Sequence, residues 1–555
     1  MHPYHIPWPK AALRTRCDYT PYAGEWLCHH HRRLSEVALE KSSAKNSYDL
    51  VPYPSGAFRQ THPDHLAALA TLYGMNPAPA PTCRVLELGC ASGGNLIPMA
   101  VSLPTATFVG LDYSRREIDE GLDRIATLGL ANLTLRHMDI LEVSDIRTEL
   151  GSFDYILVHG VFSWVPEPVR LRILEICRDG LSNQGVAYIS YNAYPGWHIR
   201  QFVRGLTRFH VRNIEEPKER ARQARSVLAF AEHAVPAIDA LYKAELKGQL
   251  DRVAQLTDEV LLHDELGDCN QPYYFHEFME LAGQYGLQFL TEADPSYMRM
   301  ERYSPQVQQA LSGAGDLVVT GQYLDFLGCR PFRQTLLCHK QVSLQRSPQP
   351  NSTAQFSIQG TCSPVSKKVD LSTGVVERFQ SANHVIIGLD EPLSKAALLY
   401  LHRVAPQPVP FESLLLAAWK LLDRAGEPSD SDREGLGELL LAVHGGGMVE
   451  LHLHPPSFAA TPSQRPRASA LVRHQIQHEP FIVNLLHQNV HIEDPLARCM
   501  LSFLDGQTDR AVLLLAVEAE LAQGRLVIPS DGPPLTERIE ANLHKMARMA
   551  LLERE

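Results

Sequence analysis

RVLELGCASGGNLIPMA, residues 84–100, places an apolar run, a loop of small residues and the start of a helical pattern next to one another. The run 84–89 predicts a buried strand, and 94–103 predicts a helix. Gly89, Ala91 and Gly93 keep bulky side chains out of the turn, so a ligand can approach the backbone there. This succession is typical of an open α/β sheet, which binds ligands at the carboxyl ends of its strands.

The pattern continues outward as strands that alternate with helices. Further strands are predicted at 107–113, 133–139, 153–160, 185–191, 286–294 and 331–340. Helices are predicted at 114–130, where Ser114 and Glu117 form a capping box, and at 168–181. The stretch 198–265 is helical and separates the fifth strand from the sixth. The sequence therefore predicts an α/β fold with seven strands, helices on both faces and a helical insertion.

Length and composition restrict the class of protein. A chain of 555 residues is expected to form about three domains. The net charge of −11 argues against a general nucleic-acid binder or a binder of anionic membranes. No apolar run approaches the roughly 18 residues of a membrane-spanning helix. Ten cysteines without a CxxC motif are consistent with reduced thiols and a cytoplasmic protein.

Changes in composition suggest where the domains begin and end. The run Cys28-His29-His30-His31 is not expected to bind a metal, because adjacent side chains do not converge easily on one ion, and no other metal site is expected. Residues 346–365 are rich in Ser, Pro and Gln, which indicates a boundary. Two helical patterns, the Gly445–Gly447 turn and a strand at 448–453 resemble a winged helix, and a second short strand is expected at 524–528. The expected division is a disordered tail at 1–45, a cofactor-binding core at 46–200, a helical insertion with the last two strands at 201–345, a linker at 346–390 and a mainly helical, winged-helix-like region at 391–555.

Three acidic residues at successive strand ends indicate which ligand the loop binds. A pyrophosphate would be repelled by Glu87, whereas a ligand that carries an ammonium and a sulfonium would be attracted. S-adenosylmethionine (SAM) is such a ligand. Asp112 ends the second strand, where a carboxylate suits a ribose diol. Asp139 ends the third strand and is placed to accept a hydrogen bond from an adenine amino group.

The loop also resembles a known family signature. Glu87-Leu-Gly89-Cys-Ala91-Ser-Gly93 resembles the ExGxxxG motif of class I (Rossmann-like) SAM-dependent methyltransferases. The phrases VPYPSGAFRQTHPDHLAALATLYG, HGVFSWVP, SYNAYPGWHIR and YYFHEFMELA resemble members that carry a methyltransferase regulatory domain. These members include the rickettsial lysine methyltransferases of outer-membrane protein. The resemblance covers about 48–345 and implies a SAM-dependent enzyme; it weakens toward the C-terminus, where such proteins carry a winged-helix-like domain.

The cofactor site expected from the motif and the strand ends extends over four strands. Its residues are Glu87, Gly89, Ala91, Gly93, Asn95, Asp112, Tyr113, Asp139, Ile140 and His159. The segment 53–63 precedes the first strand and is expected to cover the methionine end of the cofactor, with Arg59 facing its carboxylate. A plain loop packed on the sheet is an equal alternative for this segment.

The acceptor pocket is expected after the fourth and fifth strands, where aromatic residues gather. Its candidates are Tyr53, Phe162, Trp164, Tyr191, Asn192, Tyr194, Trp197 and Tyr273. His159, Tyr194 and Trp197 are candidates for catalysis, although positioning alone often suffices for methyl transfer. Simple packing under a loop is an equal alternative for Trp164 and Trp197.

The expected reaction is N-methylation of lysine side chains in a protein substrate. A small metabolite or a peptide natural product remains an alternative acceptor, because cofactor motifs do not specify the acceptor. A SAM-binding regulator without catalysis is a third hypothesis. A protein substrate is the expected partner, and a homodimer is left open.

Overall fold

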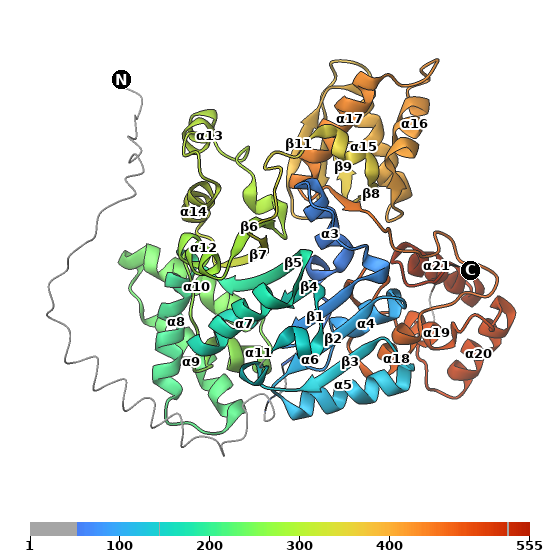
Figure 1. Cartoon of the computed structure of the whole chain (residues 1–555). Coiled ribbons are helices and arrows are strands. Elements are labelled where there is room, and N and C mark those ends of the chain that lie inside the picture. Colours follow the sequence, from blue (N-terminus) through green and yellow to red (C-terminus); the bar gives the residue numbers. More distant parts are fainter. Residues whose placement is uncertain (1–50, 52, 144, 530–531, 555) are drawn as a thin grey trace, which may run out of the picture.

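The computed structural model describes residues 51, 53–143, 145–529 and 532–554. The tail expected at 1–45 and the run Cys28–His31 lie outside the described residues. Figure 1 shows a central sheet flanked by helices, a helical projection made by α8 to α10, and two further units formed by the C-terminal half.

The core is one sheet of seven strands in the order β3-β2-β1-β4-β5-β7-β6. The strands are β1 (Arg84–Leu88), β2 (Thr107–Asp112), β3 (Leu133–His137), β4 (Phe153–Val158), β5 (Leu181–Asn192), β6 (Leu287–Glu292) and β7 (Phe332–His339). Strands β1 to β5 are parallel, and β7 runs antiparallel between β5 and β6. The predicted seven-stranded α/β sheet is confirmed.

The alternation of side chains along the strands explains why helices cover both faces. In β1, Val85 packs into one core, whereas Leu86 and Leu88 pack into the other. Helices α3 (Pro63–Leu72), α4 (Leu96–Ser102) and α5 (Arg115–Leu128) cover the first face. Helices α6 (Ile146–Leu150), α7 (Glu167–Gly180) and α12 (Phe275–Gln284) cover the second. Ser114 caps α5, as expected, by accepting a hydrogen bond from the amide of Glu117 at 3.2 Å.

The helical insertion lies between β5 and β6, as predicted. Its main helices are α8 (Gly196–Val211), α9 (Pro217–Ala234) and α10 (Ala240–Ala254), which share a small core that includes Val203, Ala224 and Leu228. The short α11 (Asp258–Val260) and a π-helical turn, η6 (Leu261–Glu265), lead back to the sheet. Helices α13 (Pro305–Ser312) and α14 (Leu317–Gly328) then separate β6 from β7.

The segment 346–390, which we expected to be a linker, instead forms part of a packed unit. Strands β8 (Ser357–Gly360), β9 (Cys362–Pro364), β10 (Glu377–Ser381) and β11 (Ile386–Leu389) lie in it. β8 pairs with β12 (Val409–Pro410) and β13 (Val449–His452), and helices α15 (Pro392–Val404), α16 (Phe411–Leu421) and α17 (Asp430–Gly445) complete the unit. β9, β10 and β11 pair with one another, whereas β8 depends on distant partners that its local composition does not indicate.

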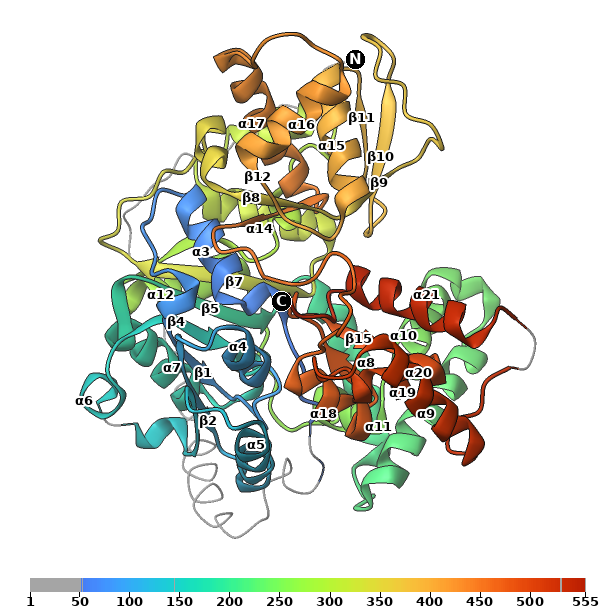
Figure 2. The same ribbon diagram turned by 90° about the vertical axis from the view of Figure 1, so that its right-hand side faces the viewer.

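The C-terminal unit has a separate core. It contains α18 (Ala470–His478), the hairpin β14 (Phe481–Val483) and β15 (Asn489–His491), α19 (Pro495–Phe503), α20 (Arg510–Ala522) and α21 (Leu535–Arg548). The strand expected at 524–528 is wrong: its backbone pairs with no strand in the described part of the chain. Figure 2 shows this unit beside the helical face of the sheet formed by α4 and α5. Arg124 of α5 pairs with Glu479 at 3.7 Å across this junction. None of the described helices has both the length and the apolar character needed to cross a membrane.

Candidate active site

The loop after β1 depends on backbone conformations that few residues adopt. Gly89 and Gly93 both have φ +76°, and a side chain at Gly89 would clash with Val161. Ala91 has φ +45°, which costs about 1 kcal/mol for a residue with a side chain. The amide of Ala91 donates to Oδ2 of Asp112 at 2.8 Å, and this bond holds the loop in place. The loop therefore presents its backbone at the carboxyl edge of the sheet.

Glu87 is buried at the end of β1, with 3% of its surface exposed. Its Oε1 accepts a hydrogen bond from Nδ2 of Asn95 at 2.8 Å, and its Oε2 has no hydrogen-bond partner within the described residues. Burial raises the pKa of Glu87 to about 8; the bond from Asn95 opposes the shift, and the charge of Asp112 adds to it. A buried carboxylate oxygen without a partner fits a cationic group, so the residues present match the ammonium-bearing ligand expected from the sequence.

The other two acids lie at the ends of β2 and β3. Oδ1 of Asp112 accepts from the amide of Ser114 at 2.8 Å, and Oδ1 of Asp139 accepts from the amide of Leu141 at 2.9 Å. A carboxylate has about four acceptor sites, so both residues retain capacity for a ligand. Tyr113 is 61% exposed and stacks on the ring of His137. Ile140 is half-buried and begins the short η3 (Ile140–Glu142).

The segment that precedes the sheet packs directly on the glycine loop. Oγ of Ser55 accepts from the amide of Gly94 at 2.9 Å, and the amide of Phe58 donates to Oδ1 of Asn95 at 3.0 Å. Thr61 is fully buried, and its Oγ1 accepts from Nδ2 of Asn95 at 3.0 Å. A side chain at Gly94 would clash with Ser55, so glycine permits this approach. The segment therefore forms a cover over the cofactor loop.

His159 lies between this cover and the sheet. Its ring centroid is 3.9 Å from that of Phe58, and its Nδ1 is 2.8 Å from the hydroxyl of Tyr188. Burial lowers the pKa of His159 to about 4, so the imidazole is neutral near pH 7. A neutral ring packed between aromatic groups suits a wall of the cofactor site.

Two residues of the cover make contacts outside the core sheet. We expected Arg59 to face the cofactor carboxylate, but it forms an ion pair with Glu450 of β13. The ring of Tyr53 packs edge-on against His263 in η6, at 5.7 Å between centroids. Burial raises the pKa of the neighbouring Asp264 to about 6, and Glu265 adds to the shift. Tyr53 thus joins the cover to the helical insertion.

The aromatic residues expected around the acceptor separate into an inner and an outer group. Phe162, Tyr191 and Trp197 are almost fully buried, so packing explains their character. Tyr191 stacks on Phe278 at 4.0 Å, and Tyr273 packs on Phe162 at 5.8 Å.

Trp164 and Trp197 meet edge to face at 5.8 Å. Tyr194 belongs to the outer group: it is half-buried, stacks on His198 at 4.2 Å and lies 5.1 Å from the ring of Tyr274. Asn192 is buried; its amide donates to Oγ of Ser163, and its Nδ2 donates to Oδ1 of Asn270. Of the acceptor candidates, Tyr53, Trp164, Tyr194 and Tyr273 are half-buried, and the other four are buried.

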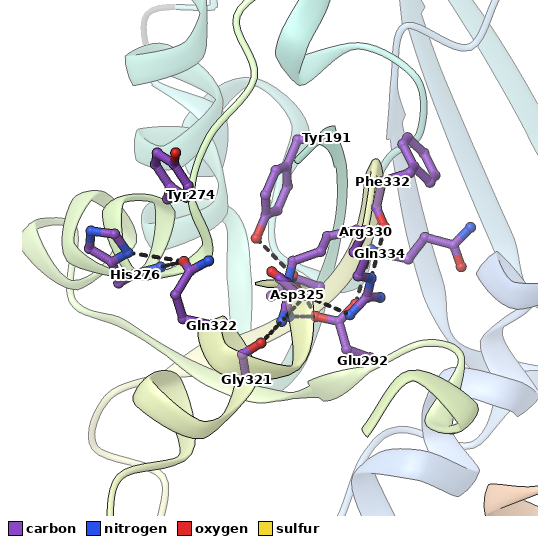
Figure 3. Close-up of polar contacts among 12 residues, drawn as sticks. Tyr191, Tyr274, His276, Glu292, Gly321, Gln322, Asp325, Arg330, Phe332 and Gln334 are labelled. Atoms are coloured by element: carbon purple, nitrogen blue, oxygen red, sulfur yellow. Dashed lines mark hydrogen bonds and ion pairs between the residues drawn. The ribbon is translucent and has the colours of Figure 1, made fainter. Parts of the chain in front are cut away.

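A buried charge network lies beneath the inner aromatic group (Figure 3). Glu292 of β6 accepts from Arg333 at 2.6 Å and from Arg330 at 2.7 Å. Asp325 of α14 accepts two bonds from Arg333, at 2.8 and 2.9 Å. Burial alone would raise the pKa of Glu292, but the two arginines bring it below its usual value. Oγ1 of Thr335 donates to Glu292 and lies 3.2 Å from the hydroxyl of Tyr191, which connects the network to the acceptor side.

Two contacts at the cofactor loop were not predicted from the sequence. Nε2 of His487 lies 2.9 Å from Oδ1 of Asn95, and the side chain of Asn489 bonds both backbone groups of Ala57. Both residues come from the β14–β15 hairpin, about 390 residues or more from their partners in sequence. No local pattern marks them, because the contact exists only once the C-terminal unit packs on the core.

Comparisons with known proteins agree with this arrangement. Residues 80–235 match a methyltransferase domain, 257–339 match a predicted methyltransferase regulatory domain, and 464–553 match the PKMT C-terminal winged helix domain. The regulatory-domain match includes β6 and β7, so it is partly built into the core sheet. The winged-helix match begins after the Gly445–Gly447 turn on which we based that expectation.

The similarity to known proteins extends over almost the whole chain. An uncharacterized protein of Rickettsia prowazekii is 32% identical over 504 residues, which are 89% of this chain and 90% of that protein. The structure of PKMT2 from Rickettsia typhi covers 90% of this chain and 100% of its own, with 26% identity and a TM-score of 0.80. A second structure of that protein, in complex with AdoHcy, matches equally well. The cofactor is therefore SAM, and the chain belongs to the class I SAM-dependent methyltransferases that carry a methyltransferase regulatory domain and a PKMT C-terminal winged-helix domain.

Proposed function

We propose that this enzyme methylates the ε-amino groups of lysine residues in protein substrates. The observation that carries the proposal is the similarity to PKMT2 from Rickettsia typhi over 90% of this chain, which agrees with the resemblance of the sequence to the rickettsial lysine methyltransferases. The match of residues 464–553 to the PKMT winged helix supports it independently of the core.

We propose specific roles for the residues at the carboxyl edge of the sheet. SAM, when bound, supplies an electrophilic methyl group on a sulfonium. The expected cofactor residues Glu87, Gly89, Ala91, Gly93, Asn95, Asp112, Tyr113, Asp139, Ile140 and His159 hold it. Trp164, Asn192, Tyr194 and Tyr273 line the acceptor side, with Tyr53 closing it from the cover, while Phe162, Tyr191 and Trp197 support these residues from below.

The aromatic residues proposed for the acceptor side suit a lysine for a physical reason. A lysine ammonium has no free electron pair, so it must lose a proton before it attacks a methyl group. Desolvation lowers the pKa of an amine, and the rings of Tyr194 and Tyr274 provide apolar surface on the proposed acceptor side. Nε2 of Gln201 donates to the hydroxyl of Tyr194 at 2.8 Å and fixes the orientation of the ring. These residues therefore position and desolvate the amine, and they take no covalent part in the reaction.

Methyl transfer to identified residues tests the proposal. The full chain is incubated with methyl-labelled SAM and a panel of purified bacterial proteins, and modified residues are mapped by mass spectrometry. We expect methyl-lysine, and we expect no labelling of substrate whose lysines have been acetylated beforehand. The variant Asp112→Ala serves as the low-affinity control. Label found only in small molecules, or only on residues other than lysine, would contradict the proposal.

We also propose a homodimer and a cytoplasmic location. Phe209, Phe230 and Leu241 on α8 to α10 are large apolar side chains between 66% and 89% exposed, and we propose that a second copy covers them. Light scattering should give twice the mass of the chain, and Phe209→Glu with Phe230→Glu should give the monomer. A monomeric wild-type protein would refute the dimer.

The eight described cysteines are unpaired, which fits a reducing compartment and supports the proposed cytoplasmic location.

A further inference from the structure

His487 of the C-terminal unit reaches the cofactor loop of the core. Its side chain is 5% exposed, and its Nε2 lies 2.9 Å from Oδ1 of Asn95. The backbone amide of Phe58 can only donate and faces the same atom, which identifies that atom as the amide oxygen, so Nε2 of His487 carries the proton and donates. Asn95 lies between this histidine and Glu87, which connects a residue near the end of the chain to the acid at the end of β1.

The bonds to Asn95 determine which way its amide group faces. Oδ1 accepts from Nε2 of His487 and from the amide of Phe58, while Nδ2 donates to Glu87 and to Thr61. A reversed amide would place Nδ2 against two donors and Oδ1 against a carboxylate. The two donors, Nε2 of His487 and the amide of Phe58, therefore hold Nδ2 of Asn95 toward Oε1 of Glu87. Oε2 of Glu87 then stays available to a ligand.

The hairpin that carries His487 is shaped for this contact. His487 has φ +55°, a left-handed conformation that costs of order 1 kcal/mol and is often found at functional sites. The turn is held by Asn484, whose Oδ1 accepts from the amides of Leu486 and Gln488. Asn489, on the same hairpin, accepts from the amide of Ala57 at 3.1 Å and donates to its carbonyl at 2.8 Å. The hairpin thus contacts both parts of the site: His487 binds Asn95 at the cofactor loop, and Asn489 binds Ala57 in the segment that covers it.

We propose that His487 is a positioning residue for the cofactor, through which the C-terminal unit orients Asn95 and keeps Oε2 of Glu87 free for the ammonium of SAM. The C-terminal unit is then part of the cofactor site and acts on cofactor affinity through the chain His487–Asn95–Glu87. This role is separate from the identity of the methyl acceptor.

Substitutions at His487 test the proposal in the full chain, with AdoHcy as the probe in calorimetry. His487→Ala should raise the Kd about five- to tenfold, the worth of one buried hydrogen bond. His487→Gln keeps a side-chain N–H donor at the same backbone conformation and should restore most of the affinity. His491→Ala, on the exposed face of the same hairpin, is the matched control and should bind like wild type. A His487→Ala variant that folds and binds AdoHcy with unchanged Kd would overturn the proposal.

A double-mutant cycle separates positioning from general destabilisation. If His487 acts through Asn95, then adding His487→Ala to Asn95→Ala should change the Kd less than twofold, roughly the error of additivity. Fully additive losses would refute the chain of contacts.

The wild-type protein provides a test that does not depend on folding of a variant. Coupling between two sites is reciprocal, so AdoHcy should slow hydrogen exchange at the amides of 484–489. Unchanged exchange at these amides with saturating AdoHcy would also count against the proposal.

Discussion

Glu87 and Asn95 share a hydrogen bond of 2.8 Å between Oε1 and Nδ2, and Oε2 of the same carboxylate is buried without a partner among the described residues. A buried carboxylate of this kind is unfavourable in isolation and favourable beside a cation. The same pair therefore influences cofactor affinity, its pH dependence and the stability of the ligand-free enzyme.

Neutralising Glu87 should weaken cofactor binding. Glu87→Gln keeps the size of the side chain but removes the charge, so SAM and AdoHcy should bind more weakly by about 1–3 kcal/mol, the range of a charge-assisted hydrogen bond. Calorimetry measures the change. Glu120→Gln, on the exposed face of α5, is the control and should bind as wild type does. Equal affinity of Glu87→Gln and wild type would remove Glu87 from the site.

Cofactor affinity should rise with pH in the wild type. The pKa of Glu87 is about 8 without ligand, and a neighbouring cation favours the ionised form, so binding releases a proton below pH 8. The Kd for AdoHcy should fall between pH 6 and pH 8 and then level. The amino group of the ligand titrates as well, so the quantity to compare is the ratio of wild-type Kd to Glu87→Gln Kd at each pH. A ratio that stays constant from pH 6 to pH 8 would contradict the assignment.

The same substitution should stabilise the ligand-free enzyme. The pKa of Glu87 rises from 4.5 to about 8 on folding, so the stability it contributes is complete below pH 4.5 and is lost as the pH rises toward 8. Glutamine has no such loss. The melting temperature of Glu87→Gln should therefore exceed that of wild type by a few degrees at pH 8, with a smaller difference at pH 5. A lower melting temperature at pH 8 would show that Glu87 is stabilised by contacts other than those described.

Asp112 should act on the cofactor in two ways. It is placed to bind a ribose diol, and it holds the amide of Ala91 in its left-handed conformation. Asp112→Ala should weaken AdoHcy binding by about 1–3 kcal/mol. Asp112→Asn retains one side-chain oxygen and should lose less. Asp123→Ala, exposed on α5, serves as the matched control in the same calorimetric assay. If Asp112→Ala and Asp123→Ala bind equally well, Asp112 does not contact the cofactor.

Local patterns predicted the core sheet and the cofactor loop for a physical reason. Each parallel strand is a short apolar run bounded by turn residues, and each acid of the site lies at or just beyond the end of a strand, so sequence order already places Glu87, Asp112 and Asp139 along one edge. The N-cap at Ser114 is similarly local. Periodicity and spacing were therefore sufficient to predict the seven strands and the helical insertion.

The features that sequence reasoning missed depend on long-range packing. β8 pairs with strands about 50 and 90 residues away, and a Ser- and Pro-rich composition gives no sign of such pairing. Arg59 was expected to face the cofactor carboxylate because its charge fits, and its ion pair with Glu450 of another unit could not be foreseen from local sequence. The contact of His487 with Asn95 spans 392 residues. A side chain whose role depends on the docking of two units has no local signature.

Breaking the buried network under the acceptor side should be strongly destabilising. Arg333 is fully buried and neutralises both Glu292 and Asp325, so Arg333→Leu leaves two buried carboxylates with only Arg330 to compensate them. We expect a loss of about 3–5 kcal/mol in the free energy of unfolding of the core, measured by urea denaturation.

Lys247→Ala removes an exposed ion pair with Asp251 and should cost less than about 0.5 kcal/mol. Adding Asp325→Asn to Arg333→Leu keeps the Glu292–Arg330 ion pair and removes the one uncompensated carboxylate, so the double variant should recover part of the loss, because the penalty comes from unpaired buried charge. If Arg333→Leu costs no more than Lys247→Ala, the network is not buried as described. If the double variant is no more stable than Arg333→Leu alone, lost packing of the arginine rather than unpaired charge explains the effect.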